Sequence, residues 1–301
     1  MEHHDGAWRC GLIDVGSNTV RAAVFEVKGR NYRLLADAKD FCSLIACVND
    51  GVLSEEGFGR LCCALTRLDA FCREWGCERV DCFATASLRA VRNFDEVQAK
   101  VAHTGVEMTL LSGEEEALCD YAGLQSTGVR SGLGMDLGGG SGQLFRFRNG
   151  KLEAYASFPI GVMAMKRRCS ANCVPGEENR EAIRRFVQEQ LASCPELRDG
   201  DTDTLYVMGG SVRAAALMRD EMFGFGGNEL TLDELEQLFK SLSSEKGRTV
   251  LQKIESNRLP TMGSGLIVLL AVLEYMGVRR LRVVHNGVRE GYLWKNIMRQ
   301  F

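Results

Sequence analysis

Two aspartates stand at the ends of apolar segments, each directly before a turn rich in glycine and small hydroxyl residues. One lies in GLIDVGSNTVRAAVFEV and the other in GLGMDLGGGSGQLFRF. Glycines in such a turn let backbone N–H groups approach a phosphate closely, Ser and Thr hydroxyls add donors, and a carboxylate can hold a hydrated cation. A single turn of this kind could equally be a hairpin turn with no ligand. The first turn supplies these candidate phosphate ligands: Asp14, Gly16, Ser17, Asn18 and Thr19.

The two turns match each other residue by residue. One constant offset along the chain relates Asp14 to Asp136, Gly16 to Gly138, and Thr19 to Ser141. We infer an internal duplication in which each copy carries one strand–turn–strand hairpin. Two matching copies favour phosphate binding over a plain turn. The second copy supplies the candidate phosphate ligands Gly138, Gly139, Gly140 and Ser141, with Asp136 as a candidate metal ligand and Asp14 as a second one.

Three consecutive glutamates open the segment LLSGEEEALCDYAGL. Ser112 is a natural helix N-cap, and Glu115 three residues later completes a capping box, so Glu115 has a structural explanation. Glu116 lacks one, and a carboxylate at a helix start beside a phosphate can orient and deprotonate a water molecule. The alternative is a solvated acid that the helix dipole favours. With the two hairpins present, we expect Glu116 to be a catalytic base.

Two further features could bind anions. Arg89, in ATASLRAVRN, follows an apolar segment, and its planar guanidinium suits bidentate contact with phosphate. A solvated surface arginine is the alternative. In YVMGGSVRAAAL, Gly209, Gly210 and Ser211 lie between a predicted strand and a predicted helix, where a helix N-terminus can bind an anion or nucleotide. A glycine turn needed only for packing is the alternative.

Strand and helix signals alternate along the chain, which favours α/β layers. Apolar spacing predicts helices at 54–75, 88–100, 180–197 and 231–242, and strands at 79–87, 106–111, 204–208 and 281–284. A length of 301 residues with 45% hydrophobic content is enough for two buried cores. No low-complexity linker separates the halves, so we expect two domains that meet along a cleft.

Composition excludes several function classes. With 37 basic and 40 acidic residues, no global charge draws the protein to nucleic acid or to an anionic membrane. The start MEHHDGAWRC lacks signal-peptide features, and the longest apolar run, 267–273, is too short to span a bilayer, so we expect a cytoplasmic protein. The twelve cysteines lack regular spacing and are expected to be mostly reduced core residues.

Zinc binding by pairs of cysteines is a less favoured alternative. Cys169 with Cys173, or Cys72 with Cys77, could bind a metal, but neither pair has a second Cys/His pair at zinc-site spacing.

Taken together, the motifs resemble the exopolyphosphatase and guanosine pentaphosphate phosphohydrolase (Ppx/GppA) family, within the actin and sugar-kinase superfamily. The resemblance covers nearly the whole chain and is carried by eight segments in the family's order: GLIDVGSNTVRAAVFEV, FATASLRAVRN, LLSGEEEALCDYAGL, GMDLGGGSGQLF, SFPIGVMAMKRR, VMGGSVRAA, GSGLIVLLAVLEYMG and HNGVREGYL. It implies two ribonuclease-H-like domains, each a mixed five-stranded sheet flanked by helices, with the active site in the interdomain cleft. The expected domains are 1–123 and 124–288, with a C-terminal helix at 289–301 packing back on the first.

The resemblance also implies an activity, namely Mg²⁺-dependent release of orthophosphate from the end of inorganic polyphosphate, from pppGpp, or from both. By motif, Glu116 corresponds to the catalytic base, Arg89 to a phosphate ligand, and Asp136 with the 138–141 loop to the second phosphate and metal site. A homodimer is implied as well.

Two residues depart from the family pattern. Gln143 stands where a metal-binding glutamate is usual, which predicts weaker metal binding, and Asn286 stands where an aspartate is usual. The departure at Gln143 keeps open a non-catalytic sensor of polyphosphate or of a guanosine polyphosphate alarmone. An ATP-dependent kinase of the same superfamily is a further alternative.

Overall fold

The computed structural model describes residues 6–89, 91–168, 174–198 and 202–299. The chain divides into two compact units, which are described one at a time. The first unit comprises Met1–Glu116 and Tyr292–Phe301, and the second comprises Ala117–Gly291. The chain passes from the first unit to the second within helix α4 (Gly113–Gln125), earlier than the expected boundary after residue 123, and returns at the end of helix α11 (Val288–Tyr292).

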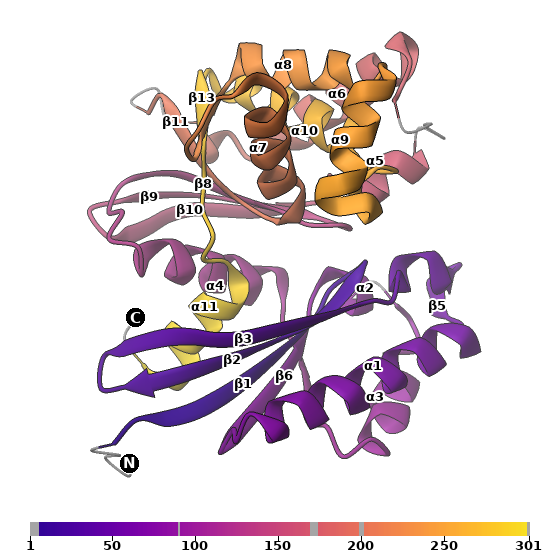
Figure 1. The fold of residues 1–301 in the computed structure, drawn as a ribbon, viewed down its shortest axis with the longest axis vertical. Helices are drawn as coiled ribbons and strands as arrows, with labels where there is room; N and C mark the ends of the chain where they lie inside the picture. Colours follow the sequence, from indigo (N-terminus) through magenta and orange to yellow (C-terminus); the bar gives the residue numbers. More distant parts are fainter. Residues whose placement is uncertain (1–5, 90, 169–173, 199–201, 300–301) are drawn as a thin grey trace. The chain divides into compact units, whose positions relative to one another are not determined.

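A five-stranded mixed sheet forms the centre of the first unit, in the order β3-β2-β1-β6-β7 (Figure 1). Strands β1, β2 and β3 pair antiparallel, whereas β1, β6 and β7 pair parallel. The three parallel strands therefore end at the same edge of the sheet. The strands are β1 (Trp8–Val15), β2 (Thr19–Lys28), β3 (Asn31–Phe41), β6 (Arg79–Ala84) and β7 (Met108–Leu110).

Helices cover one face of this sheet. Helix α1 (Glu55–Glu74) begins at Ser54, whose side chain accepts a hydrogen bond from the N–H of Gly57. Its apolar stripe packs on β1 and β2, with α3 (Phe94–Ala102) beside it (Figure 1). The remaining elements of the unit are short: η1 (Leu44–Cys47), β4 (Val48–Asn49), β5 (Val52–Leu53) and α2 (Ala86–Arg89).

The end of the chain covers the opposite face. Successive strand residues point to opposite faces, so Phe83 points away from the core that its neighbours share with α1. The ring of Tyr292 stacks on Phe83 with 4.7 Å between centroids, and Trp294, in the π-helical turn Leu293–Ile297, meets Tyr32 at 6.3 Å. Tyr292 and Leu293 are therefore buried in the first unit, with Trp294 half-buried beside them.

The second unit repeats this plan around a sheet of order β10-β9-β8-β11-β13-β12 (Figure 1). Strands β8, β9 and β10 pair antiparallel, and β8, β11 and β13 pair parallel. The parallel strands again end at one common edge. The strands are β8 (Gly132–Leu137), β9 (Gly142–Arg148), β10 (Lys151–Phe158), β11 (Thr204–Met208), β12 (Glu229–Thr231) and β13 (Arg280–Val283).

Six helices share one core with this sheet and α10 is the central one, while Tyr121 and Leu124 of α4 pack on the other face of the sheet. Nearly all of the residues of α10 are buried, because its sequence is apolar all round. No single helix of the described residues is long and apolar enough to cross a membrane, although α9 and α10, with a 90° bend between them, pass that test as a pair. The six are α5 (Val162–Arg168), α6 (Glu177–Ala192), α7 (Gly210–Phe223), α8 (Leu232–Ser241), α9 (Glu245–Glu255) and α10 (Met262–Met276).

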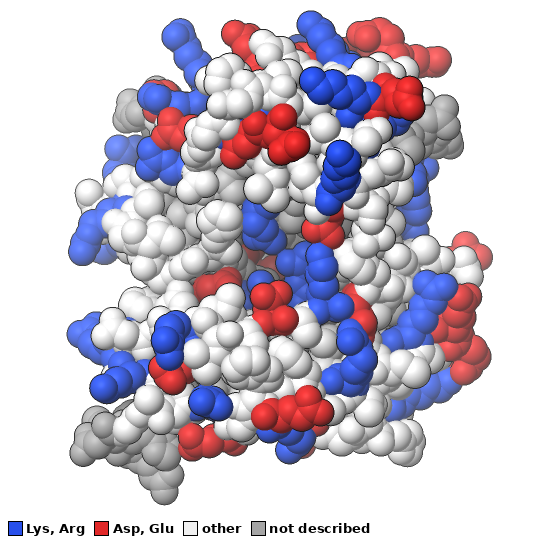
Figure 2. Space-filling model, viewed as in Figure 1, with Lys and Arg blue, Asp and Glu red and all other residues white. Residues whose placement is uncertain are grey.

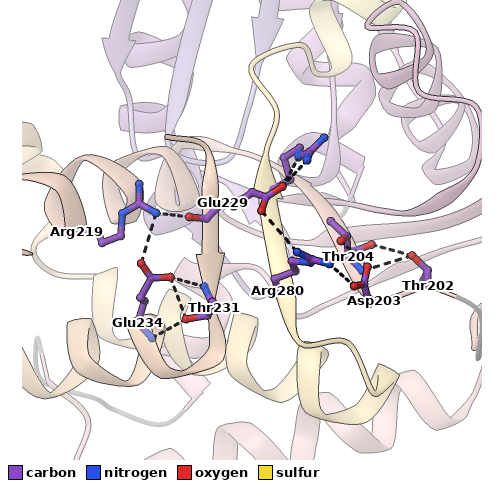
Figure 3. A network of polar contacts seen from close by, with 9 residues as sticks. Thr202, Asp203, Thr204, Arg219, Glu229, Thr231, Glu234 and Arg280 are labelled. Atoms are coloured by element: carbon purple, nitrogen blue, oxygen red, sulfur yellow. Dashed lines mark hydrogen bonds and ion pairs between the residues drawn. The ribbon is translucent and has the colours of Figure 1, made fainter. Parts of the chain in front are cut away.

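Strand β12 is a sixth strand beyond the five expected in this sheet, and polar contacts attach it (Figure 3). The side chain of Arg219, 2% exposed, donates to the carbonyls of Gly227 and Glu229. Glu234, 3.7 Å from the same guanidinium, completes a capping box with Thr231 at the start of α8. Arg219 therefore joins α7, the end of the 224–229 loop and α8.

The segment after β6 differs from its prediction. A strand was expected over 79–87 and a helix over 88–100, but β6 ends at Ala84 and α3 begins only at Phe94. Pairing with β1 ends at Val15, whose carbonyl accepts the N–H of Thr85 at 3.2 Å. Beyond this bond the chain coils into α2, so Arg89 projects from a short helical turn.

Charged side chains are mixed over the molecular face in Figure 2, where Lys and Arg alternate with Asp and Glu. This distribution agrees with the nearly even charge balance of the sequence. Any anion site on this face must therefore be local.

Glycines allow the backbones of α4 and α11 to approach each other closely within the second unit. A Cβ on Gly291 would fall on the carbonyl oxygen of Cys119, and one on Gly123 would lie 2.5 Å from the carbonyl oxygen of Gly287. We expect Gly291→Ala to lower the free energy of unfolding by about 3 kcal/mol or more, because backbone atoms cannot make room as a flexible side chain can.

The matched control is Gly59→Ala in α1, where an added Cβ meets nothing within 4 Å. That change should raise stability by about 0.5–1 kcal/mol through helix propensity. Urea unfolding of both variants checks the pair, and equal effects of the two changes would contradict this account of the crossing.

Candidate active site

The first predicted loop lies at the edge where β1, β6 and β7 end. The N–H of Gly16 donates to the carbonyl of Thr19 at 3.0 Å, which closes the turn. The carbonyls of Ser17 and Asn18 accept from the N–H groups of Ile45 and Ser43, at 3.1 and 2.9 Å, at the start of η1. In a trans peptide the N–H points opposite to its C=O. The N–H groups that follow these carbonyls, beginning with that of Asn18, therefore point away from η1.

The second loop reproduces this geometry in the second unit. The N–H of Gly138 donates to Ser141 O at 3.0 Å, and the carbonyls of Gly138 and Gly139 accept from Val162 and Met163 at 3.0 and 2.8 Å. The N-terminal turn of α5 thus takes the place of η1. The turn-closing bond and the bound carbonyl at the matching positions Ser17 and Gly139 are common to both loops, whereas the second bound carbonyl is that of Asn18 in one loop and of Gly138 in the other. The duplication inferred from the sequence therefore extends in part to the hydrogen bonds, and phosphate binding by the two loops stays a prediction.

Two residues chosen separately in the sequence are paired in the structure. Nη2 of Arg89 lies 2.9 Å from Oε2 of Glu116, and Nη1 of Arg89 donates to the carbonyl of Leu111 at 2.8 Å. Glu116 is 6% exposed, so its carboxylate is held inside the edge formed by α2 and α4. Only two of the five guanidinium N–H donors are engaged in these bonds, and the half-buried Arg89 has further donors for an anion.

The capping box predicted at the start of α4 is present. The N–H of Glu115 donates to Oγ of Ser112 at 3.1 Å, and the N–H of Ser112 donates to Oε2 of Glu115 at 2.8 Å. The bond from the Ser112 backbone lowers the pKa of Glu115. Glu115 therefore fixes the helix start, and the next residue, Glu116, points into the edge.

Close packing accounts for the glycines of the third predicted anion site. Gly209 has φ +120°, and a Cβ there would lie 2.5 Å from Leu137 O and 3.2 Å from Oδ1 of Asp136. A Cβ on Gly210 would overlap the guanidinium of Arg258. Ser211 is 1% exposed, and its Oγ has no hydrogen-bond partner among the residues described. Binding of a phosphate by these three residues stays a prediction.

Arg258 is a residue that the sequence reasoning missed. Its guanidinium is buried against the N-terminus of α7, at the edge that also carries the 138–141 loop. It reaches there from a 3₁₀ turn, Ser256–Arg258, before α10. The surrounding letters, ESNRLP, carry no signal for this placement, because a lone arginine near a proline is typical of a solvated loop.

Asp136 and Gln143 face each other as a cross-strand pair of β8 and β9. Gln143 is 1% exposed and donates from Nε2 to Oγ of Ser141 at 2.7 Å and of Ser157 at 3.0 Å. Its Oε1 has no hydrogen-bond partner within the described ranges. A buried acceptor beside a carboxylate suits a cation or its water ligands, so these two residues fit a hydrated Mg²⁺ that also binds substrate oxygens.

The equivalent pair in the first unit differs in charge. Asp14 faces Arg21 across β1 and β2, and Nε of Arg21 donates to Oγ1 of Thr19 at 3.3 Å. A cation beside Asp14 competes with a metal ion for its carboxylate. Asp136 is therefore the better candidate metal ligand of the two.

In the described parts of the chain, no three or more His, Cys, Asp or Glu residues are grouped so that they could hold a metal ion. A Mg²⁺ bound through one or two carboxylates, water and substrate phosphate forms no such group. Cys169 and Cys173 lie outside the described residues. Asn286, the second departure from the family pattern, donates from Nδ2 to Oγ of Ser126 at 2.9 Å.

Two ribonuclease-H-like units, each with a loop at the carboxyl edge of its parallel strands, are typical of the actin-like fold. The family model of the Ppx/GppA phosphatase family matches residues 23–300. The chain belongs to the Ppx/GppA phosphatase family, as its motifs predicted.

Relatives and solved structures agree with this assignment. Exopolyphosphatase 1 of Mycobacterium tuberculosis is 25% identical over 96% of this chain and 88% of that protein, and the Mycobacterium leprae protein of the same name is 24% identical over 96% and 89%. Two structures confirm the fold. An Aquifex aeolicus Ppx/GppA family member has a TM-score of 0.81 at 22% identity, covering 98% of this chain and 99% of that one. An exopolyphosphatase from Cytophaga hutchinsonii has a TM-score of 0.84 at 19% identity, covering 96% and 97%.

The capping box gives a pH-dependent prediction. Because the folded state lowers the pKa of Glu115, this residue stabilises the protein above its ordinary pKa of 4.5, and the stabilisation is lost as pH falls through the lower folded value. We expect Glu115→Gln to lower the free energy of unfolding by about 1 kcal/mol at pH 7 and by less as the pH drops below 4.5.

Urea unfolding at several pH values measures this difference. Glu114→Gln, which changes an exposed acid of the same helical turn, is the control. A Glu115→Gln effect of the same size at pH 7 and pH 3.5 would show that the charge of Glu115 plays no part.

Proposed function

We propose that this protein is a Mg²⁺-dependent phosphohydrolase that releases orthophosphate from the end of inorganic polyphosphate. The observation that carries the proposal is the buried carboxylate of Glu116, held at 2.9 Å by Arg89 at the edge that also carries the 16–19 loop. The contact with Arg89 fixes the position of this carboxylate at the edge. Curated relatives named exopolyphosphatase, which match along 96% of the chain, support the substrate.

The reaction follows from what each group can do. Glu116 takes a proton from a water molecule while the water oxygen bonds to the terminal phosphorus and the bridging P–O bond breaks. The products are orthophosphate and a chain shortened by one phosphate. Loop N–H groups and the remaining donors of Arg89 stabilise the charge on the phosphoryl oxygens, since this chemistry depends mainly on positioning and charge neutralisation.

The residues that would hold the Mg²⁺ ion are mainly in the second unit. Mg²⁺, when bound, neutralises charge on the phosphate oxygens. Asp136 would hold it, with Oε1 of Gln143 accepting from a water ligand and Asp14 as a second, weaker candidate. The same chemistry applies to pppGpp, whose 5′ end carries the same anhydride. A cytoplasmic location and a homodimer, which the family resemblance implies, stay predictions.

Replacing the base tests the proposal. Glu116→Gln keeps the shape of the side chain and removes its ability to accept a proton, so we expect release of orthophosphate from polyphosphate with Mg²⁺ to fall by about 10²–10⁴-fold. Glu114→Gln, two residues earlier in the same helix and exposed, should leave the rate within about twofold, as expected for a surface change.

Parallel reactions with pppGpp, and with ATP plus candidate acceptors, separate the related activities. Binding of polyphosphate without release of orthophosphate by the unaltered protein would favour a sensor. Phosphate transfer to an acceptor would favour a kinase. Either result would overturn the proposal.

The metal assignment makes a separate prediction. Gln143→Glu restores a negative charge beside Asp136, so it should raise the rate or lower the Mg²⁺ concentration that gives half the maximal rate by about tenfold, the typical size of a ligand-shell change. A Mg²⁺ titration of orthophosphate release measures this. The matched control is Gln125→Glu, whose side chain bonds to Gly150 O outside the edge loops. Unchanged rate and Mg²⁺ dependence in Gln143→Glu would rule out this position as part of the metal site.

A further inference from the structure

The last turn of α1 brings two cysteines together. The helix ends at Trp75 and is followed by Gly76 in the left-handed conformation, φ +71°. The N–H of Gly76 donates to Arg73 O at 2.9 Å, and the N–H of Cys77 donates to Cys72 O at 3.1 Å. These two bonds form a Schellman motif, in which the side chains at the positions of Cys72 and Cys77 pack against each other.

The two thiols differ in their surroundings. Cys72 is fully buried, and a Cβ on Gly11 of β1 would lie 2.8 Å from its Sγ, so it is packed against the sheet. Cys77 is partly exposed. Both are free, and each thiol shifts the pKa of the other, upwards for Cys72 and downwards for Cys77. The thiol of Cys77 is therefore accessible to a reagent from solvent, whereas the thiol of Cys72 is buried next to it.

A cation lies on the same turn. Nη1 of Arg9 donates to the carbonyl of Trp75 at 2.7 Å. The hydrogen bond from Cys72 lowers the pKa of Cys77, burial opposes this, and Arg9 adds to the lowering. The same hydrogen bond, together with burial, raises the pKa of Cys72. The carbonyls of Cys72, Arg73 and Trp75 all accept hydrogen bonds, which weakens the negative end of the helix that would disfavour a thiolate.

A third thiol nearby is not equivalent. Cys10, next to Arg9 on β1, is fully buried, and burial raises its pKa to about 12. It therefore stays protonated and closed to solvent, and an inert thiol of this kind is typical of a core position.

We propose that Cys77 and Cys72 are a peroxide-reactive pair that forms a reversible disulfide across the end of α1. The Cys77 thiolate attacks one oxygen of hydrogen peroxide. The O–O bond breaks, Cys77 becomes a sulfenic acid, and the departing hydroxide takes up a proton as water. The sulfur of Cys72 then attacks the sulfenic sulfur, the S–O bond breaks, and the second oxygen leaves as water with the Cys72 proton. Two thiols are oxidised and one peroxide is reduced to two waters.

Peptide mass mapping of the full-length protein tests this. Limited hydrogen peroxide is followed by alkylation of the remaining thiols. We expect a Cys72–Cys77 link, with loss of two hydrogens, before any oxidation at Cys63, which is the exposed cysteine on the same helix. Cys63→Ser should leave the link unchanged. Cys77→Ser should abolish it, and Cys72→Ser should leave a sulfenic acid at Cys77 that dimedone traps.

A measurement on the unaltered protein guards against a variant that fails to fold. Iodoacetamide at pH 7 should label Cys77 at least about fivefold faster than Cys63, although Cys63 is more exposed, because thiolate character controls the rate. Oxidation or labelling that reaches Cys63 first, or a disulfide between Cys77 and Cys10, would overturn the proposal. These measurements do not involve phosphate release, so their outcome is independent of whether the proposed function is correct.

Discussion

The candidate site depends on one recurring constraint, which is the set of hydrogen bonds that hold the carbonyls of each edge loop. The N–H groups of a following helical turn bind these carbonyls, η1 in the first unit and α5 in the second. A loop held on its carbonyl side presents its N–H groups on the other side without further cost, so the donors are fixed in direction before any anion arrives. The ion pair of Arg89 and Glu116 lies at the same edge of the sheet as the first of these loops.

The sequence was most informative where chemistry is local. The two glycine turns and the capping box of Ser112 and Glu115 are set by residues within a few positions of one another, and both are present as predicted. The pairing of Arg89 with Glu116 was not foreseen, because it depends on the parallel register that brings the ends of β6 and β7 together. Arg258 was missed for the same reason, since its neighbours at the start of α7 are distant in the chain.

Duplication conserved the geometry of the two loops but not their charge. At corresponding cross-strand positions the first unit has Arg21 opposite Asp14, and the second has Gln143 opposite Asp136. A neighbouring cation suits the first edge to an anion, whereas a neutral buried acceptor leaves the second carboxylate able to hold a cation. Under the proposed function, the first copy of this supersecondary unit would serve the phosphate and the water, and the second would serve the counter-ion. This division could not arise from a single hairpin.

The return of the chain at Tyr292 has a consequence for biosynthesis. Phe83 and Tyr32, in the sheet of the first unit, are covered by Tyr292 and Trp294, which are synthesised after the whole second unit. Domains usually fold as units from the N-terminus during synthesis. Here the aromatic face of the first sheet stays uncovered until residues 292–294 have been synthesised, while the contiguous Ala117–Gly291 unit can complete its core earlier. The first unit therefore completes its core after the second unit, although most of the first unit is synthesised earlier.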